Sequence, residues 1–438
     1  MKIIICGGGR VGATIGNYLA EDDHDITIID RNPSVVESVG ETSDLLTVCG
    51  VASHPGVLEK AGARQAEMII AATGSDETNM TACQIAHSLF KVPKKIARIG
   101  NDAYLDPQWR NLFSRDNIPI DVIISPEYEI AKAVTDRIKM PGSVNILPFS
   151  NPDYVLLGMT CLADSPADGM EAEAIKGLKS REREDLNVGL TLVVRDNEVV
   201  LPDADVFFQE GDEAYLIAPR EQIAELLTFF GHKLSKTKSL IIMGGGNVGL
   251  NLVRILNRDH FGLSVTVIEQ NIEQAQALSS EIPEENIVIA GDGLNKDILL
   301  EAGIRSCETF VTVSDNDEAN ILGALLGKKH GVANVVALTS ETSYLPMLNQ
   351  LGVDVTVNPR AITVSSILQY VRRGRIRSDY TIRDGFAEVI EIEADASSQV
   401  IQTTIDDIDL PEGTYILAVI RDNVLHFPDS QFAIQDAD

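Results

Sequence analysis

Residues 3–12 read Ile-Ile-Ile-Cys-Gly-Gly-Gly-Arg-Val-Gly, and residues 240–249 read Leu-Ile-Ile-Met-Gly-Gly-Gly-Asn-Val-Gly. Each stretch joins an apolar run, typical of a buried parallel strand, to a G-x-G-x-x-G turn and a helix-like segment. In this context the bare glycine backbone lets a pyrophosphate lie on the N–H groups at the start of the helix. One such motif is weak evidence, whereas two in matching surroundings predict a duplicated nucleotide-binding module.

We expect both glycine loops to contact a nucleotide. In the first copy the residues are Gly7, Gly8, Gly9, Arg10, Val11 and Gly12, and in the second they are Gly244, Gly245, Gly246, Asn247, Val248 and Gly249.

A second apolar strand ends in an acid in each copy, at Asp30 and Glu269. Both acids lie about 20 residues after the glycines, where Rossmann modules bind the ribose hydroxyls. A carboxylate at this place repels a 2′-phosphate, so NAD or ATP is favoured over NADP. The neighbouring Arg31 leaves NADP open.

Two equivalent loops follow the fourth apolar run of each copy, Thr73-Gly74 and Ser314-Asp315. The polar boxes after them, residues 75–79 and 316–320, are repeated at an offset of 241 (317 − 76), against 237 (244 − 7) at the glycines. In a doubly wound sheet such strand ends lie at the carboxyl edge, where ligands bind. We therefore expect Thr73, Gly74, Ser314 and Asp315 beside the nucleotide.

Each copy ends in a helix that begins at a proline, Pro126 or Pro359, after a Ser or Asn that can cap it. Residues 127–140 and 360–372 carry apolar side chains at helical spacing. We expect these crossover helices to pack on a neighbouring module, within the chain or between chains, and the protein to be an oligomer.

Short β-rich runs follow each crossover helix. Residues 195–197, which are typical of a hairpin turn, and 202–203 recur as 421–423 and 428–429, both at an offset of 226 (421 − 195). The first copy continues for a strand and a helix after Pro202, whereas ten residues follow Pro428 (438 − 428). The second β-rich module is therefore expected to be incomplete.

The expected fold class is α/β with an A-B-A′-B′ order. Two Rossmann-type doubly wound parallel-sheet modules, 1–125 and 238–357, are each followed by a crossover helix, 126–141 and 358–374, and by a small α+β module, 142–231 and 375–438.

The composition limits the classes of partner that the chain can bind and the cell compartment in which it is expected. The net charge of −29 disfavours nucleic acid, which needs a concentrated basic face. The five scattered cysteines form no CxxC pair and are interpreted as reduced thiols of a cytosolic protein. Met1-Lys2 leads directly into a strand, which leaves no room for a signal peptide, and no run approaches the roughly 18 apolar residues of a membrane span.

The glycine motifs, the two polar boxes and the tandem order resemble the TrkA family, the peripheral regulatory subunits of Trk-type bacterial potassium uptake systems. Their modules are RCK (or KTN) domains. The resemblance implies binding of NAD(H) or, alternatively, ATP/ADP, and assembly as a homo-oligomer, a dimer or a tetrameric ring. It also implies a membrane K⁺ channel subunit as partner, and a cytoplasmic location at the inner face of the plasma membrane.

The resemblance implies further nucleotide contacts. It places Arg98 near the phosphates, although an exposed strand-end base is an almost equal alternative, and the second copy has Thr339 there. The family's Gly-Asp pair is present at Asp292, but the first copy has Val51 in that place. The two sites are therefore expected to differ.

The competing hypothesis is an NAD-dependent oxidoreductase, because fold alone does not choose a function. A dehydrogenase needs an acid or base beside the nicotinamide. The intervening module offers Glu171, Glu173 and Asp185 but no histidine, and the seven histidines show no metal-binding spacing. The sequence favours a regulatory protein without a catalytic set or a metal.

Overall fold

The computed structural model describes all residues except 22–23, 43–44, 110, 141, 178–185, 197, 202–204, 233–236, 260–261, 345–346, 349–350, 369, 372–375, 383–386 and 412. Asn197, Pro202, Asp203 and Asp185 thus lie outside the described residues. The chain divides into two compact units. The first unit comprises Met1–Lys132, Thr339–Thr342 and Val357–Val371, and the second comprises Ala133–Leu338, Ser343–Thr356 and Arg372–Asp438.

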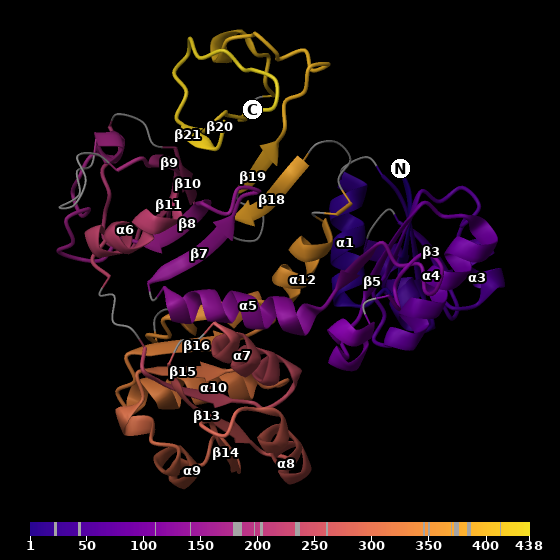
Figure 1. Cartoon of the computed structure of the whole chain (residues 1–438), viewed down its shortest axis with the longest axis horizontal. Helices are drawn as coiled ribbons and strands as arrows, with labels where there is room; N and C mark the ends of the chain where they lie inside the picture. Colours follow the sequence, from indigo (N-terminus) through magenta and orange to yellow (C-terminus); the bar gives the residue numbers. More distant parts are fainter. Residues whose placement is uncertain are drawn as a thin grey trace. The chain divides into compact units, whose positions relative to one another are not determined.

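The first unit contains a parallel sheet in the order β3-β2-β1-β4-β5-β6. Figure 1 draws residues 1–132 of this unit in indigo and purple. Its strands are β1 (Lys2–Cys6), β2 (Asp25–Asp30), β3 (Leu46–Cys49), β4 (Met68–Ala71), β5 (Lys94–Arg98) and β6 (Val122–Ile124). The helices between them are α1 (Arg10–Glu21), α2 (Pro33–Thr42), α3 (Pro55–Lys60) and α4 (Asp76–Phe90). The strand order reverses between β1 and β4, which confirms the doubly wound prediction. Sheets of this kind usually bind their ligands at the carboxyl ends of the two strands where the order reverses.

Both faces of this sheet are buried, as expected for a parallel sheet. Ile3 and Ile5 of β1 pack on one side with Ile15 of α1. Ile4 packs on the opposite side, in a cluster with Cys83 of α4. The period-two alternation of the strand explains why an uninterrupted apolar run serves two cores.

Helix α12 (Pro359–Leu368), which follows the second Rossmann copy in the chain, belongs to the first unit and packs on α1. Its Val364 and Ile367 share a core cluster with Ile15 of α1. The expected contact of this crossover helix with another module is therefore confirmed within the chain. The helix ends at Leu368, short of the expected Arg372, which lies outside the described residues.

The capping prediction holds for one crossover helix. The Asn358 Oδ1 accepts hydrogen bonds from the N–H groups of Arg360, at 3.0 Å, and Ala361, at 3.1 Å. At α5 (Pro126–Lys139) the prediction was wrong for the side chain, because the buried Ser125 hydroxyl has no hydrogen-bond partner among the described residues.

A second parallel sheet has the order β14-β13-β12-β15-β16-β17, the same as the first. Its strands are β12 (Ser239–Met243), β13 (Ser264–Glu269), β14 (Ile287–Ala290), β15 (Thr309–Thr312), β16 (Asn334–Leu338) and β17 (Val355–Val357). Helices α7 (Asn247–Arg258), α8 (Ile272–Glu281), α9 (Lys296–Glu301) and α10 (Asp317–Lys329) accompany it. The ammonium of Lys139, at the end of α5, lies 2.6 Å from the carboxylate of Asp259, which caps α7. The C-terminal end of the first crossover helix thus contacts the second copy.

The first β-rich module is an antiparallel sheet in the order β10-β9-β11-β8-β7. It consists of β7 (Ser143–Pro148), β8 (Tyr154–Thr160), β9 (Gly189–Arg195), β10 (Glu198–Val200) and β11 (Glu213–Pro219), and α6 (Ile223–Phe229) covers one face. Short 3₁₀ helices occur at Asp102–Tyr104, Pro107–Trp109, Ala172–Gly177, Arg220–Gln222, Ile304–Ser306, Thr342–Tyr344 and Ile405–Asp407.

The second β-rich module pairs β18 (Ile376–Ile382) with β19 (Ala387–Ile392), and β20 (Val419–Arg421) with β21 (Val424–His426). Asp422 and Asn423, both with positive φ, form the turn of the second hairpin as a type I′ turn requires. Leu425 and Ile382 join Leu156 and Tyr215 in one apolar cluster on the face of the first module's sheet opposite α6. The two β-rich modules therefore pack on each other.

A partly buried ion pair is repeated in both β-rich modules. Arg195 binds both carboxylate oxygens of Asp212, at 2.8 and 2.7 Å, and Arg421 binds Asp438 in the same way, at 2.8 and 2.6 Å. Both pairs have the offset of 226 found in the sequence (438 − 212). The duplication thus extends to side-chain geometry.

Candidate nucleotide-binding sites

The first glycine loop has the conformation that its sequence predicts. Gly7 has a φ of +107°, and a Cβ atom on it would lie 2.8 Å from the Ala72 carbonyl oxygen. A Cβ on Gly12 would lie 1.9 Å from the Gly7 carbonyl oxygen, so helix α1 packs on the loop with no room for a side chain. Gly9 is exposed and a Cβ on it would meet nothing within 4 Å, which leaves open space at the start of α1. A phosphate fits this arrangement because the first N–H groups of a helix lack internal partners.

Two further residues of the motif flank this space. Arg10 is exposed at the first position of α1, and Val11 is half-buried beside it. Arg10 therefore brings a positive charge to the start of α1.

Asp30 ends β2 and binds the glycine loop. Its carboxylate accepts hydrogen bonds from the N–H groups of Gly8, at 2.7 Å, and Asn32, at 2.8 Å. It is half-buried, whereas the neighbouring Arg31 is exposed. Asp30 therefore fixes the glycine loop, a role that the strand-end position did not reveal, and its contact with a ribose stays a prediction.

The Thr73-Gly74 loop lies against the glycine loop, since a Cβ on Gly7 would be 3.2 Å from the Thr73 Cα. It is held by Asn79, whose fully buried side chain accepts from the Thr73 N–H at 3.0 Å and hydroxyl at 2.7 Å. The Asn79 amide donates to the carbonyls of Thr73 and Arg98. Gly74 is exposed.

Arg98 and Val51 complete the first set. Arg98 ends β5, and its guanidinium forms an ion pair of 3.0 Å with Glu127 of α5. Val51 is half-buried after β3, and its carbonyl accepts the His54 N–H. Arg98 is thus the last residue of its strand, and Val51 lies two residues beyond the end of its strand.

The second glycine loop repeats the first in detail. Gly244 has a φ of +116°, and a Cβ on it would lie 2.8 Å from the Ser314 nitrogen. A Cβ on Gly249 would lie 2.1 Å from the Gly244 carbonyl oxygen. Gly246 caps α7, and the nearest atom to a Cβ on it would be the Gln274 amide nitrogen at 3.8 Å, so the space is narrower than at Gly9. Asn247 is exposed and Val248 is half-buried.

Glu269 takes the place of Asp30. Its carboxylate accepts from the N–H groups of Gly245, at 2.7 Å, and Asn271, at 2.8 Å, and it is 9% exposed. Asp292 is exposed after β14 and accepts the Leu294 N–H at 2.9 Å.

The Ser314-Asp315 loop is held by Asn320 as the first loop is held by Asn79. The buried Asn320 side chain accepts from the Ser314 N–H and hydroxyl, both at 2.8 Å, and donates to the Leu338 carbonyl at 3.0 Å. Asp315 is exposed. We assigned no role to either asparagine from the sequence, although their repetition within the polar boxes was a usable signal.

The two sites differ in charge. The positions of Arg10 and Arg31 in the first copy are Asn247 and Gln270 in the second, all four being exposed.

Within the described residues there is no group of three or more His, Cys, Asp or Glu side chains that could hold a metal ion. No described helix combines the length and the hydropathy needed to cross a membrane.

Comparison with known proteins agrees with this geometry. The family model of the TrkA-N domain matches residues 3–126 and 240–359. A Trk system potassium uptake protein TrkA of Azorhizobium caulinodans is 39% identical over 438 residues, which are 100% of this chain and 94% of that protein. A protein of the same name from Halomonas elongata is 34% identical, over 96% of this chain and 91% of its own length.

Among solved structures, the RCK domain of GsuK superposes with a TM-score of 0.62 at 17% identity, over 100% of this chain and 90% of that one. This likeness confirms the expected RCK fold. Two matches to the same domain model, together with relatives similar over the full chain, show that this chain belongs to the TrkA family.

Proposed function

We propose that this chain is the nucleotide-sensing regulatory subunit of a Trk-type potassium uptake system. It binds NAD(H), or ATP/ADP as the alternative ligand, and gates K⁺ flux through a membrane channel subunit. The observation that carries the proposal is the repetition of one loop–acid–helix geometry on a chain of this family, whose relatives are named potassium uptake proteins. The solved GsuK channel, described as bound to NAD and as bound to ADP in separate structures, has the same fold.

In each site the glycine loop would hold the phosphates and the strand-end acid the ribose. The residues assigned to the first site are Gly7 to Gly12, Asp30, Arg31, Val51, Thr73, Gly74 and Arg98. Those assigned to the second are Gly244 to Gly249, Glu269, Asp292, Ser314 and Asp315. Asn79 and Asn320 act as positioning residues, because each ties its strand-end loop to the neighbouring strand.

The first site is expected to prefer the more anionic nucleotide. Arg10 and Arg31 are exposed around its loop, whereas Asn247 and Gln270 occupy these positions in the second copy. Each additional phosphate charge gains from nearby cations. We therefore assign ATP or ADP most readily to the first site and a dinucleotide to the second.

The oxidoreductase alternative is not favoured. The relatives are named as potassium uptake proteins, and Asp185, one of the three acids considered from the sequence, lies outside the described residues. The backbone of Glu171 bridges to Phe207, and Glu173 lies exposed in a short 3₁₀ helix.

The partner is a membrane K⁺ channel subunit, on whose cytoplasmic side the chain docks as a homo-oligomer, a dimer or a tetrameric ring. Because the chain has a net charge of −29, we expect the docking face of that subunit to be basic.

We also propose the following module boundaries: 1–125, 126–141, 142–231, 238–357, 358–374 and 375–438.

The test is reconstitution of the channel subunit in vesicles, with and without the chain, across NAD, NADH, ATP and ADP. K⁺ flux should depend on the chain and on the nucleotide, and Gly9→Asp, which places a carboxylate in the open space at α1, should abolish the response to the first site's ligand. A flux indifferent to both chain and nucleotide would reject the regulatory role.

A further inference from the structure

The second β-rich module repeats the first strand pair of the first β-rich module. Leu147 of β7 is paired with Leu156 of β8, and Tyr380 of β18 with Val389 of β19, at a common offset of 233 (380 − 147). Each pair also has a register shift at the beginning of its first strand. The two strand pairs therefore have the same register.

The neighbouring strand position differs between the modules. In the first module β11 lies between β8 and β9 and pairs with β8 along its whole length, from Glu213 to Pro219. In the second, β20 corresponds to the end of β9 at the offset of 226 (421 − 195). Within the described part of that module, β19 pairs only with β18 and β20 only with β21. The remaining edges of β19 and β20, here called the open position, correspond to the two edges that β11 binds, and an unpaired edge is a template for another strand.

The backbone at one end of the open position already has the geometry of the first module. The Cys161 N–H donates to the Asp212 carbonyl at 2.7 Å, immediately before β11 begins. At the equivalent place the Ala394 N–H donates to the Asp438 carbonyl at 2.9 Å. The edge of β19 is therefore set to pair with a strand as the edge of β8 pairs with β11.

An exposed apolar face adjoins this edge. Leu157 and Met159 of β8 are fully buried in the core that α6 covers. Their equivalents at the offset of 233, Ile390 and Ile392, are 42% and 63% exposed. The neighbouring Val389 is buried in the cluster shared with the first module, so Ile390 and Ile392 point to the opposite face. No described residue of the second module gives these two side chains the cover that α6 provides in the first.

We propose that a separate polypeptide docks at the open position by donating a β-strand followed by a helix. The first module shows the chemistry of this segment, because β11 is buried on both faces from Glu213 to Ala218 and α6 then covers one face of the sheet. The donated strand needs apolar side chains on both faces, and its helix needs an apolar stripe that packs on Ile390 and Ile392. A second copy of this chain does not supply the strand through β11, which is already paired on both edges. In such strand addition the backbone hydrogen bonds provide affinity and the alternating side chains provide specificity.

The test is fluorescence anisotropy of the full chain with a labelled peptide that copies residues 213–230. We expect saturable binding with a dissociation constant of about 1–100 μM. Ile390→Asp and Ile392→Asp should each weaken binding about tenfold or more, because the peptide helix would bury an unpaired carboxylate. Both isoleucines are exposed in the unbound chain, so these changes remove little packing from the fold. A peptide with Leu216→Pro should also bind about tenfold more weakly, because proline cannot donate to the strand ladder.

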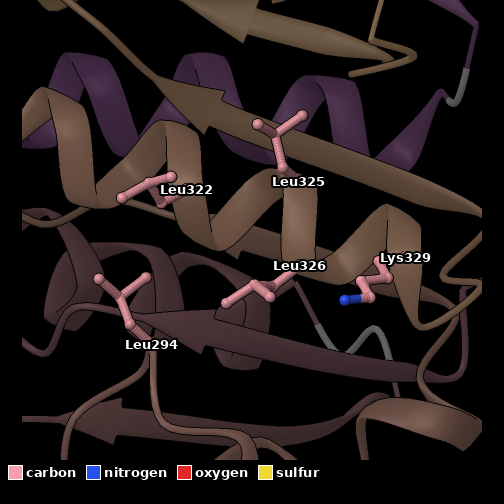
Figure 2. A pocket seen from close by; sticks show the side chains of 5 residues that line it. All are labelled: Leu294, Leu322, Leu325, Leu326 and Lys329. Atoms are coloured by element: carbon pink, nitrogen blue, oxygen red, sulfur yellow. The ribbon is translucent and has the colours of Figure 1, made fainter.

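The control surface is a shallow hollow of about 250 Å³ on α10 (Figure 2). It is lined by Leu294, Leu322, Leu325, Leu326 and Lys329. A peptide that adsorbs to any exposed apolar side chain would also bind there, since Leu322 is 53% exposed. Leu322→Asp should instead leave the peptide affinity within about twofold of that of the unchanged chain.

Hydrogen exchange separates strand addition from contact through the apolar face alone. The amides of Ala387–Ile392 should exchange more slowly when the peptide is bound, because the open edge of β19 is then paired. The proposal is overturned if the unchanged chain does not bind the peptide over this concentration range, if the Ile390 and Ile392 variants bind like it, or if exchange in β19 does not slow. Circular dichroism of each variant checks that it is folded. Neither nucleotide site contributes a residue to the open position, so each outcome leaves the proposed function untouched.

Discussion

Removal of the Asp30 carboxylate should weaken the first site in two separable ways. The carboxylate accepts the N–H groups of Gly8 and Asn32, so Asp30→Ala leaves the buried Gly8 donor without an acceptor. That loss costs the first unit about 1–3 kcal/mol of unfolding free energy. Loss of a charged hydrogen bond to the ribose should weaken nucleotide binding by a further ~1–3 kcal/mol, or about 5- to 150-fold.

Asp30→Asn separates these effects. Asparagine keeps one side-chain acceptor, which suffices for either the Gly8 or the Asn32 N–H, while the charge is removed. We expect a smaller loss of stability than in Asp30→Ala but a similar loss of affinity for NADH or ATP. The preference for NADH over NADPH should also narrow, because the 2′-phosphate is no longer repelled.

The assay is isothermal titration calorimetry in a Glu269→Gln background, which weakens the second site through the equivalent carboxylate. Thermal unfolding without ligand reports the loop contribution alone. If Asp30→Ala lowers the melting temperature but leaves the nucleotide affinity unchanged, Asp30 only fixes the loop and its ribose role is rejected. Unchanged melting in Asp30→Ala would instead contradict the hydrogen bonds to the backbone.

Three further predictions concern stability. Asn79→Ala and Asn320→Ala should each lower the unfolding free energy by about 2–4 kcal/mol in urea titrations, because several backbone groups lose a buried partner. Ile367→Ala, at a side chain 1% exposed, should lower the unfolding free energy by about 2–5 kcal/mol in the same measurement. This loss would measure how strongly α12 is packed on the first unit. Burial lowers the pKa of His232 below its ordinary value, and the hydrogen bond between its ring Nε2 and the Thr160 carbonyl offsets this in part. The stability contributed by the neutral ring should therefore be complete above pH ~6.5 and fall as the pH drops toward the lowered pKa. His232→Asn should flatten urea midpoints between about pH 5 and 7 relative to the unchanged chain.

The duplicated Rossmann sheets could be predicted because their signals are local. Glycines with positive φ at Gly7 and Gly244, and uninterrupted apolar strands before them, report on backbone geometry within a few residues. The repeat then supplied an internal check on every element. The hairpin at Asp422-Asn423 was predictable for the same reason.

Contacts between distant segments were not predictable in the same way. Helical periodicity indicated that residues 360–372 bury a face, but not that Val364 and Ile367 meet α1. Likewise, the sequence did not reveal that Leu425 packs beneath the sheet of the first β-rich module. Ser125 failed as a cap although Asn358 succeeded, because cap preference does not specify the side-chain rotamer that burial allows.

The packing of α12 on α1 could transmit a conformational change from the first nucleotide site to the second half of the chain. Helix α1 begins at the glycine loop, and Ile15 in its middle shares a core cluster with Ile367. A nucleotide bound at the start of α1 thus touches the same helix that anchors the segment following the second sheet. Close-packed cores transmit displacement, and a ligand shifts a conformational equilibrium only by its differential affinity for the two states. If nucleotide binding to the glycine loop favours one position of α1, then α12, which packs on α1, should move with it. The second Rossmann copy directly precedes α12 in the chain, so this movement would also act on the second copy. Loss of the Ile367 side chain should therefore change the nucleotide affinity of the first glycine loop little. It should, however, weaken the coupling between nucleotide binding at this loop and the conformation of the second Rossmann copy.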